Sequence, residues 1–206
     1  MEVITEMISR ARNNLNRGVN VMIFWGYLVA ATAIANFILL QAPAVGHDAY
    51  SVWLLMIPGA VVSYFINRRI DRTAVVRTHI DRIIRSAWAG FGISVFVFWG
   101  MITAFACLTR SAEVMFLITP VILTMLGLGE YVTACACRAR PMKWIAALFW
   151  LGAILCVFPF RWQSVDGHLA GTLYQGYQQL IMAVCMIAGF AVPGHLIQRK
   201  QKQSHV

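Results

Sequence analysis

The residues of this chain best suited to chemistry lie close together in one stretch, LGLGEYVTACACRAR, at positions 126–140. It holds one carboxylate, Glu130, and two cysteines, Cys135 and Cys137, and it ends in basic residues. Thiolates and carboxylates bind metal ions, and carboxylates also transfer protons. Residues two apart point to nearly opposite faces of a helix, so one helix cannot present both cysteines to the same metal. Because neither a CxxC nor an HxxxH spacing occurs, the sequence predicts no metal site.

Glu130 is the only acidic residue inside an apolar segment of the chain. A carboxylate inside a membrane costs about 2.5 to 3.5 kcal/mol on insertion scales and is by default a candidate functional residue. Two interpretations stay open. Glu130 binds a proton or a cation, or it pairs with a basic residue of the inner connections, such as Arg138, and thereby sets the register of its helix. We favour the second, because the basic end of the segment is two helical turns away.

A second candidate, His195, follows Pro193 and Gly194 near the end of the last apolar segment, at a depth similar to or shallower than that of Glu130. A pair of Glu130 and His195 would form a proton relay. No nucleophile motif, phosphate-binding loop or cofactor fingerprint occurs in the chain. The sequence therefore predicts neither an enzyme nor a bound cofactor.

The elements that carry these residues are apolar helices. Apolar residues make up 60% of the chain, charged residues 12%, and the mean hydropathy is +0.69. A span needs roughly 20 predominantly apolar residues, and inside a bilayer the backbone must satisfy its own hydrogen bonds. The sequence predicts an all-α polytopic membrane protein with six spans: Val19–Gln41, Ser51–Asn67, Ala87–Leu108, Val114–Ala136, Trp144–Phe160 and Tyr177–Ile197.

The basic residues predict the orientation of these spans. All of the 17 Lys and Arg residues except Arg110 and Arg161 fall on one side of the predicted membrane. The positive-inside rule makes that side cytoplasmic, which places both termini in the cytoplasm. Because the basic residues flank the spans, we attribute the net charge of +9 to topology and to attraction of anionic lipid headgroups, and not to nucleic acid.

Three regions follow from this pattern. Residues 1–18 form an amphipathic interfacial helix, in which Ile4, Ile8, Ala11 and Leu15 share one face and which Gly18 is expected to break. Residues 19–198 form the six-helix transmembrane domain, which includes a basic cytoplasmic linker at 68–86. Residues 199–206 form a basic cytoplasmic tail.

The six spans also suggest three diverged two-helix hairpins. The odd-numbered spans begin with similar aromatic stretches, in which Trp25, Trp88 and Trp150 recur at nearly equal spacing. The even-numbered spans end in small or helix-weakening residues that are candidates for helix packing: Pro58 and Gly59, Gly127 and Gly129, Pro193 and Gly194. Hairpin repeats keep the same orientation, so they would be related by an axis along the membrane normal.

The chain also resembles a known group of proteins. The amphipathic start, IFWGYLVA, the basic linker into AWAGFGISVFVFWG, and AVPGHLIQRK near the end are similar to small six-span bacterial inner-membrane proteins found widely in Bacteroidetes. The resemblance covers nearly the whole chain. It implies the same topology, and it carries over no functional residues because no activity is established for the group.

Two functions remain after these exclusions. The short connections and the lack of buried rows of charge favour a non-enzymatic accessory, regulatory or interaction subunit that binds a protein partner or forms a homo-oligomer. The alternative is a small-solute or ion transporter that uses Glu130, although few polar residues are available to line a path.

Overall fold

The computed structural model describes residues 2–41, 46–73, 79–109, 113–137, 140–158 and 170–203. All regular structure in these ranges is helical, and no β-strand occurs within them. The elements in chain order are α1 (Glu2–Gln41), η1 (Gly46–Leu55), α2 (Met56–Thr73), α3 (His79–Thr109), η2 (Glu113–Leu117), α4 (Ile118–Ala136), α5 (Arg140–Val157), α7 (Ala170–Met186), η3 (Ile187–Ala191) and α8 (Val192–Gln203).

Five stretches of these helices are long and apolar enough to cross a membrane: Gly18–Gln41, Ser51–Arg69, Arg82–Thr109, Val114–Ala136 and Gly176–Arg199. They match five of the predicted spans closely. The other predicted span, Trp144–Phe160, corresponds to a shorter apolar helical stretch, Met142–Val157, and its last two residues lie outside the described ranges. The all-helical membrane class is thus confirmed for the described part of the chain.

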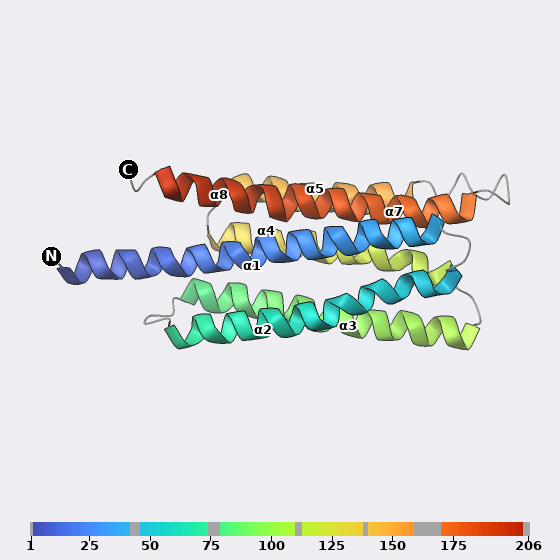
Figure 1. Cartoon of the computed structure of the whole chain (residues 1–206), viewed down its shortest axis with the longest axis horizontal. Helices are drawn as coiled ribbons and strands as arrows, with labels where there is room; N and C mark the ends of the chain where they lie inside the picture. The colour runs from blue at the N-terminus through green and yellow to red at the C-terminus, as the bar shows by residue number, and fades with distance from the viewer. Residues whose placement is uncertain are drawn as a thin grey trace.

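The expectation that Gly18 breaks the N-terminal helix is wrong. Helix α1 runs without interruption from Glu2 to Gln41 and projects beyond the other helices at its N-terminal end (Figure 1). A glycine inside a helix costs about 1 kcal/mol relative to alanine, which weakens a helix but does not end it. The amphipathic stretch and the first span are therefore one helix; the side chains of residues 2–17 lie outside the described set.

Prolines mark where several helices begin. Pro58, Pro120, Pro141 and Pro193 each lie in the first turn of α2, α4, α5 and α8. Proline lacks a backbone N–H, and the first turn is where that donor is not needed within the helix. Before Pro193 the chain forms the π-helical turn η3, which closes with a hydrogen bond from the N–H of Val192 to the carbonyl oxygen of Ile187.

The core of the molecule lies between α1, α4, α5, α7 and η3. Its buried members include Ala33, Leu123, Phe149, Ala183 and Phe190. Helices α4 and α5 pack closely, as do α1 and α7, and both pairs are antiparallel. Figure 1 shows α1 lying along α7 and α8, whereas α2 and α3 form a separate layer on the other side.

Small residues allow the close approach of α1 to the last helix. A Cβ on Gly26 would lie 2.9 Å from the backbone nitrogen of Ala191 and 3.0 Å from Cβ of Phe190. Ala30 and Ala33 continue the same face of α1 and are buried. In a membrane, where lipid is as apolar as the side chains, such small surfaces are what bring helices together.

Candidate functional site around Glu130

Glu130 lies in the core of the bundle. It occupies the buried face of α4, together with Leu126, Gly127 and Ala134, and only 2% of its surface is exposed. Its Oε2 atom is buried and has no hydrogen-bond partner among the described residues. Arg138, the partner that the sequence suggested, lies outside those residues. A buried carboxyl oxygen without a partner loses its hydration and gains nothing in return, so this position requires an explanation.

Helix α5 covers one flank of Glu130. The indole ring of Trp150 occupies the space that a Cβ on Gly127 would need, and that Cβ would also lie 3.1 Å from the carbonyl oxygen of Ala146. Trp150 is held in place by a hydrogen bond from its Nε1 to the carbonyl oxygen of Thr124, at 3.3 Å. Gly127 therefore makes room for an aromatic ring one turn before the carboxyl.

Helix α3 covers the other flank. Nε1 of Trp88 donates to Oγ1 of Thr133 at 3.1 Å, and this hydroxyl donates to the carbonyl oxygen of Gly129 at 2.8 Å. A Cβ on Gly129 would lie 3.5 Å from the Trp88 ring, which is ordinary contact. The flank facing α3 is therefore less tight than the flank facing α5.

An aromatic cluster links these helices to η3. The ring centroids of Trp88 and Phe190 are 5.8 Å apart, and those of Phe190 and Phe149 are 5.4 Å apart, both in edge-to-face geometry. Phe149 fills the space beside Gly189. These rings make the core that contains Glu130 strongly apolar, so a charge on its carboxyl would be poorly solvated.

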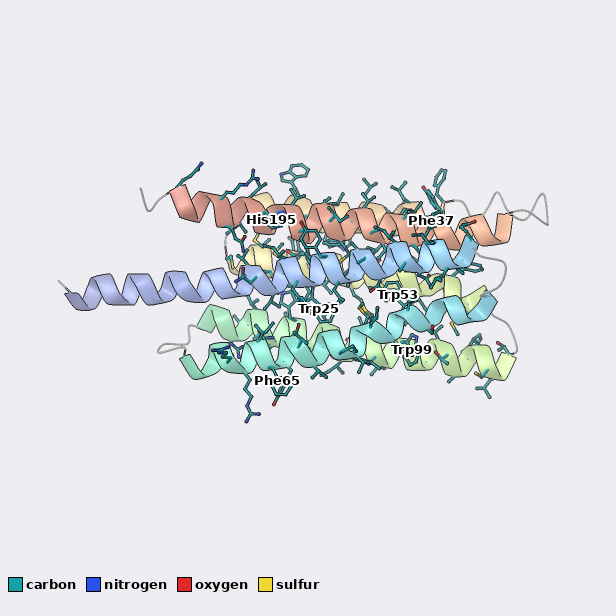
Figure 2. All side chains as sticks on the ribbon, in the orientation of Figure 1. Trp25, Phe37, Trp53, Phe65, Trp99 and His195 are labelled. Carbon is teal, nitrogen blue, oxygen red and sulfur yellow. The ribbon has the colours of Figure 1, made fainter. Side chains whose placement is uncertain are left out.

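The structure does not bring His195 to Glu130. His195 is exposed on α8, and its Nε2 lies 3.0 Å from the hydroxyl oxygen of Tyr27 on α1 (Figure 2). No described contact joins the two residues proposed for a proton relay. The neighbouring Gly194 packs on Ile23 of α1, whereas Pro193 is half-buried.

The remaining glycine and proline positions differ in their surroundings. Gly59 is buried against Leu28 and Trp25 of α1, whereas Pro58 is exposed. Each of the first two predicted hairpins thus has a tryptophan of its first helix beside a glycine of its second, namely Trp25 beside Gly59 and Trp88 beside Gly129.

Sequence reasoning missed a pair of buried amides in α7. Gln178 and Gln179 are buried, and Nε2 of Gln178 donates to the carbonyl oxygens of Phe116 and Cys156, at 3.1 and 3.3 Å. These bonds tie α7 to η2 and to the end of α5. The pair stands at the very start of the predicted span from Tyr177, where polar residues are ordinarily attributed to the interface; two adjacent amides inside an apolar stretch were the available signal.

The cysteines do not form a site with Glu130. Cys135 and Cys137 are exposed, and Cys156 and Cys185 are buried. Within the described residues, no three His, Cys, Asp or Glu side chains are grouped so that they could hold a metal ion.

Comparisons with models of protein families, with curated proteins and with solved structures find no match for this chain. The resemblance to small six-span bacterial membrane proteins therefore stays a prediction. Function has to be argued from the geometry alone.

Proposed function

We propose that the chain is a six-span protein of a bacterial inner membrane, with both termini in the cytoplasm, that acts without catalysis by binding the membrane helix of a partner chain. The observation that carries this proposal is the isolation of α3. Only 6% of its apolar stretch is buried inside the molecule, and Ile102 is the only buried side chain between residues 82 and 109. By comparison, the stretch at Ser51–Arg69 is 11% buried, and the stretches in α4 and at Gly176–Arg199 are 39% and 44% buried.

The exposed face of α3 has the surface of a helix-packing face. Gly90 stands four residues before Ser94, and Gly100 stands four residues before Ala104, and all four are exposed. Nothing lies within 4 Å of a Cβ placed on Gly90 or Gly100. Small residues at this spacing let two membrane helices approach closely, whereas contact with lipid alone does not require them. This face, Gly90–Ser94–Gly100–Ala104, is called the α3 face below.

Larger apolar residues beside the α3 face add contact area for a partner. Phe96, Val97 and Met101 are more than half exposed on this side of α3, whereas Trp99, which is labelled in Figure 2 and also more than half exposed, follows Gly90 by nine residues and so lies on the opposite side of the helix. Aromatic and methionine side chains are enriched where proteins bind one another. We assign the α3 face to a protein helix on these grounds, and the partner is either a second copy of this chain or another membrane protein.

The test is photo-crosslinking in intact membranes. A photoreactive residue at Val97, which is 57% exposed beside the α3 face, is compared with one at Ile154, which is 62% exposed on α5. We expect a discrete product of higher mass from position 97 only, and Gly100→Leu should reduce its yield several-fold without lowering the melting temperature. A product from neither position would show that lipid covers the α3 face, and equal products from both would show that crosslinking is not specific to this face.

A second candidate function is the transport of a small solute or ion, in which Glu130 binds a proton or cation. The observation in its favour is the buried Oε2 atom without a described partner. The Glu130→Gln comparison that separates the two functions is given in the Discussion.

A further inference from the structure

A groove of about 330 Å³ lies on the surface of α8 and is lined by Val192, His195, Leu196 and Arg199. These residues recur at helical spacing and so form one face of α8, which we call the α8 groove. Helix α8 ends where α1 begins, at the end of the bundle that carries the described basic residues (Figure 1). The groove therefore lies where the last helix leaves the apolar layer.

The lining divides by chemistry along the helix. Val192, at the end nearer the middle of the bundle, is apolar and exposed, and Arg199, at the outer end, is basic and exposed. His195 and Leu196 lie between them, one polar and one apolar. A ligand that fits this lining must itself have a polar, anionic end and an apolar continuation.

Contacts with α1 hold the polar part of the α8 groove in place. The Tyr27 hydroxyl bonds Nε2 of His195 at 3.0 Å, and the two rings lie 5.8 Å apart, so the imidazole has a defined position. One turn further along, Nε2 of Gln198 donates to Oδ1 of Asn20 at 2.6 Å. When the Tyr27 hydroxyl donates to Nε2, the proton of the imidazole is on Nδ1, which can then donate to an anion. The α8 groove is thus pre-organised.

The local charge favours an anion. No acidic residue follows Asp166 in the sequence, and Lys200 follows Arg199 directly. Guanidinium groups bind phosphate oxygens through two parallel hydrogen bonds, and basic residues at the cytoplasmic surface attract anionic lipid. The positive charge of the α8 groove, its apolar half and its position at the edge of the apolar layer all favour the same class of ligand.

We propose that the α8 groove binds one anionic phospholipid, with Arg199 and His195 contacting its phosphodiester and with Val192 and Leu196 contacting the first carbons of its acyl chains. Free phosphate has the same anionic group, but the apolar half of the groove would have no role in binding it. This inference is independent of the α3 face and of Glu130.

The test uses the purified full chain and counts bound lipid by native mass spectrometry, with phosphatidylglycerol or phosphatidylcholine added at equal concentration. We expect selective retention of phosphatidylglycerol. Arg199→Gln should weaken that retention at least about fivefold, because one cation near the surface contributes roughly 1 kcal/mol to anionic lipid binding. Arg82→Gln removes the same charge from an exposed position on α3 and should weaken it less than twofold.

Three results would overturn the proposal. Equal retention of the two lipids by the unchanged chain would do so without any variant. Equal losses in Arg199→Gln and Arg82→Gln would show diffuse attraction to the basic end of the molecule. Displacement of the lipid by inorganic phosphate in the same concentration range would assign the site to the free anion. Tyr27→Phe gives a further check, because losing the hydroxyl that positions His195 should weaken phosphatidylglycerol binding while Arg199 remains.

Discussion

Glu130 is a carboxyl group in an apolar core, and one of its oxygens has no described partner. Such a group either meets a cation that reaches inward from the basic end of the bundle or binds a proton or cation from solution. The two cases differ in stability. Breaking a buried ion pair by removing one partner costs about 3–5 kcal/mol, whereas removing an isolated buried charge costs little.

The first prediction concerns Glu130→Gln. We expect its melting temperature in detergent to stay within about 2 °C of that of the unchanged chain, because the amide keeps the shape and removes a poorly solvated charge. Thermal unfolding followed by tryptophan fluorescence measures this. A fall of more than about 6 °C would instead show that Glu130 belongs to an ion pair on which the fold depends.

The same variant distinguishes the two proposed functions. If the protein acts by binding a partner through the α3 face, Glu130→Gln keeps the crosslink at position 97 and complements a deletion strain. A variant that folds and crosslinks normally but fails to complement would favour transport.

The second prediction concerns the glycine before Glu130. Gly127→Ala places a methyl group where the Trp150 indole lies and should destabilise the protein by about 1–3 kcal/mol. Gly129→Ala is the matched control, because its Cβ would lie 3.5 Å from Trp88 and needs no rearrangement. Equal melting temperatures for the two variants would mean that α4 and α5 do not approach at Gly127.

Among the helices, α1 and α3 have the most surface that does not pack on other helices of the chain. Helix α1 is 40 residues long, and its first turns extend beyond its neighbours (Figure 1). In the apolar stretch of α3, one side chain, Ile102, is buried within the chain, and most of the others are exposed. Helix α1 thus extends past the end of the bundle, and α3 leaves exposed surface along its length.

The third prediction tests the continuity of α1. Gly18→Ala should raise the melting temperature by about 2–4 °C, because alanine is more favourable than glycine inside a helix by about 0.8–1 kcal/mol and no atom lies within 4 Å of the new methyl group. Gly26→Ala in the same helix should lower it, since its Cβ would lie 2.9 Å from the Ala191 nitrogen. A lower melting temperature for Gly18→Ala would instead support the predicted break of the helix at Gly18.

At the scale of the whole molecule, the described basic residues gather at one end of the helix bundle. Helix α1 begins and α8 ends at the same end of the bundle, where α2 also ends and α3 and α5 begin (Figure 1). These helix ends carry the basic residues Arg69, Arg82, Lys143 and Arg199. An even number of membrane crossings would produce this arrangement, and the positive-inside rule predicts that this end is cytoplasmic.

The fourth prediction is therefore a topology. Alkaline phosphatase fused at Gly46, Ser111 or Gly167 should be active, because this enzyme folds only outside the cytoplasm. Fluorescent-protein fusions at Thr73, Pro141 or Ser204 should fluoresce, because the fluorescent protein folds only in the cytoplasm. An inverted result at one well-expressed site would contradict the six-span topology. The site in the segment after Phe160 decides whether the short helix α5 crosses the membrane.

Much of the fold could be predicted because apolar length and flanking charge are local properties. Long apolar stretches in the sequence were sufficient to predict five of the stretches that can cross a membrane within about five residues, and the prolines in the first turns of α2, α4 and α5 are visible in the same way. Glu130 was identified for the same reason, since a single carboxylate stands out against apolar neighbours. The break at Gly18 was predicted wrongly because a glycine weakens a helix by less than the surrounding residues stabilise it.

Which faces meet is a different kind of information, and only the tertiary structure supplied it. Nearly every face of these helices is apolar, so hydrophobic periodicity does not distinguish a face that packs on protein from one that meets lipid. The fit of Trp150 beside Gly127, the bond of His195 to Tyr27 instead of Glu130, and the burial of Gln178 depend on contacts between residues far apart in the chain. Composition therefore determined the all-helical class with helices apolar enough to cross a membrane, whereas packing of small residues against large ones decided that Glu130 is enclosed and that most of α3 is exposed.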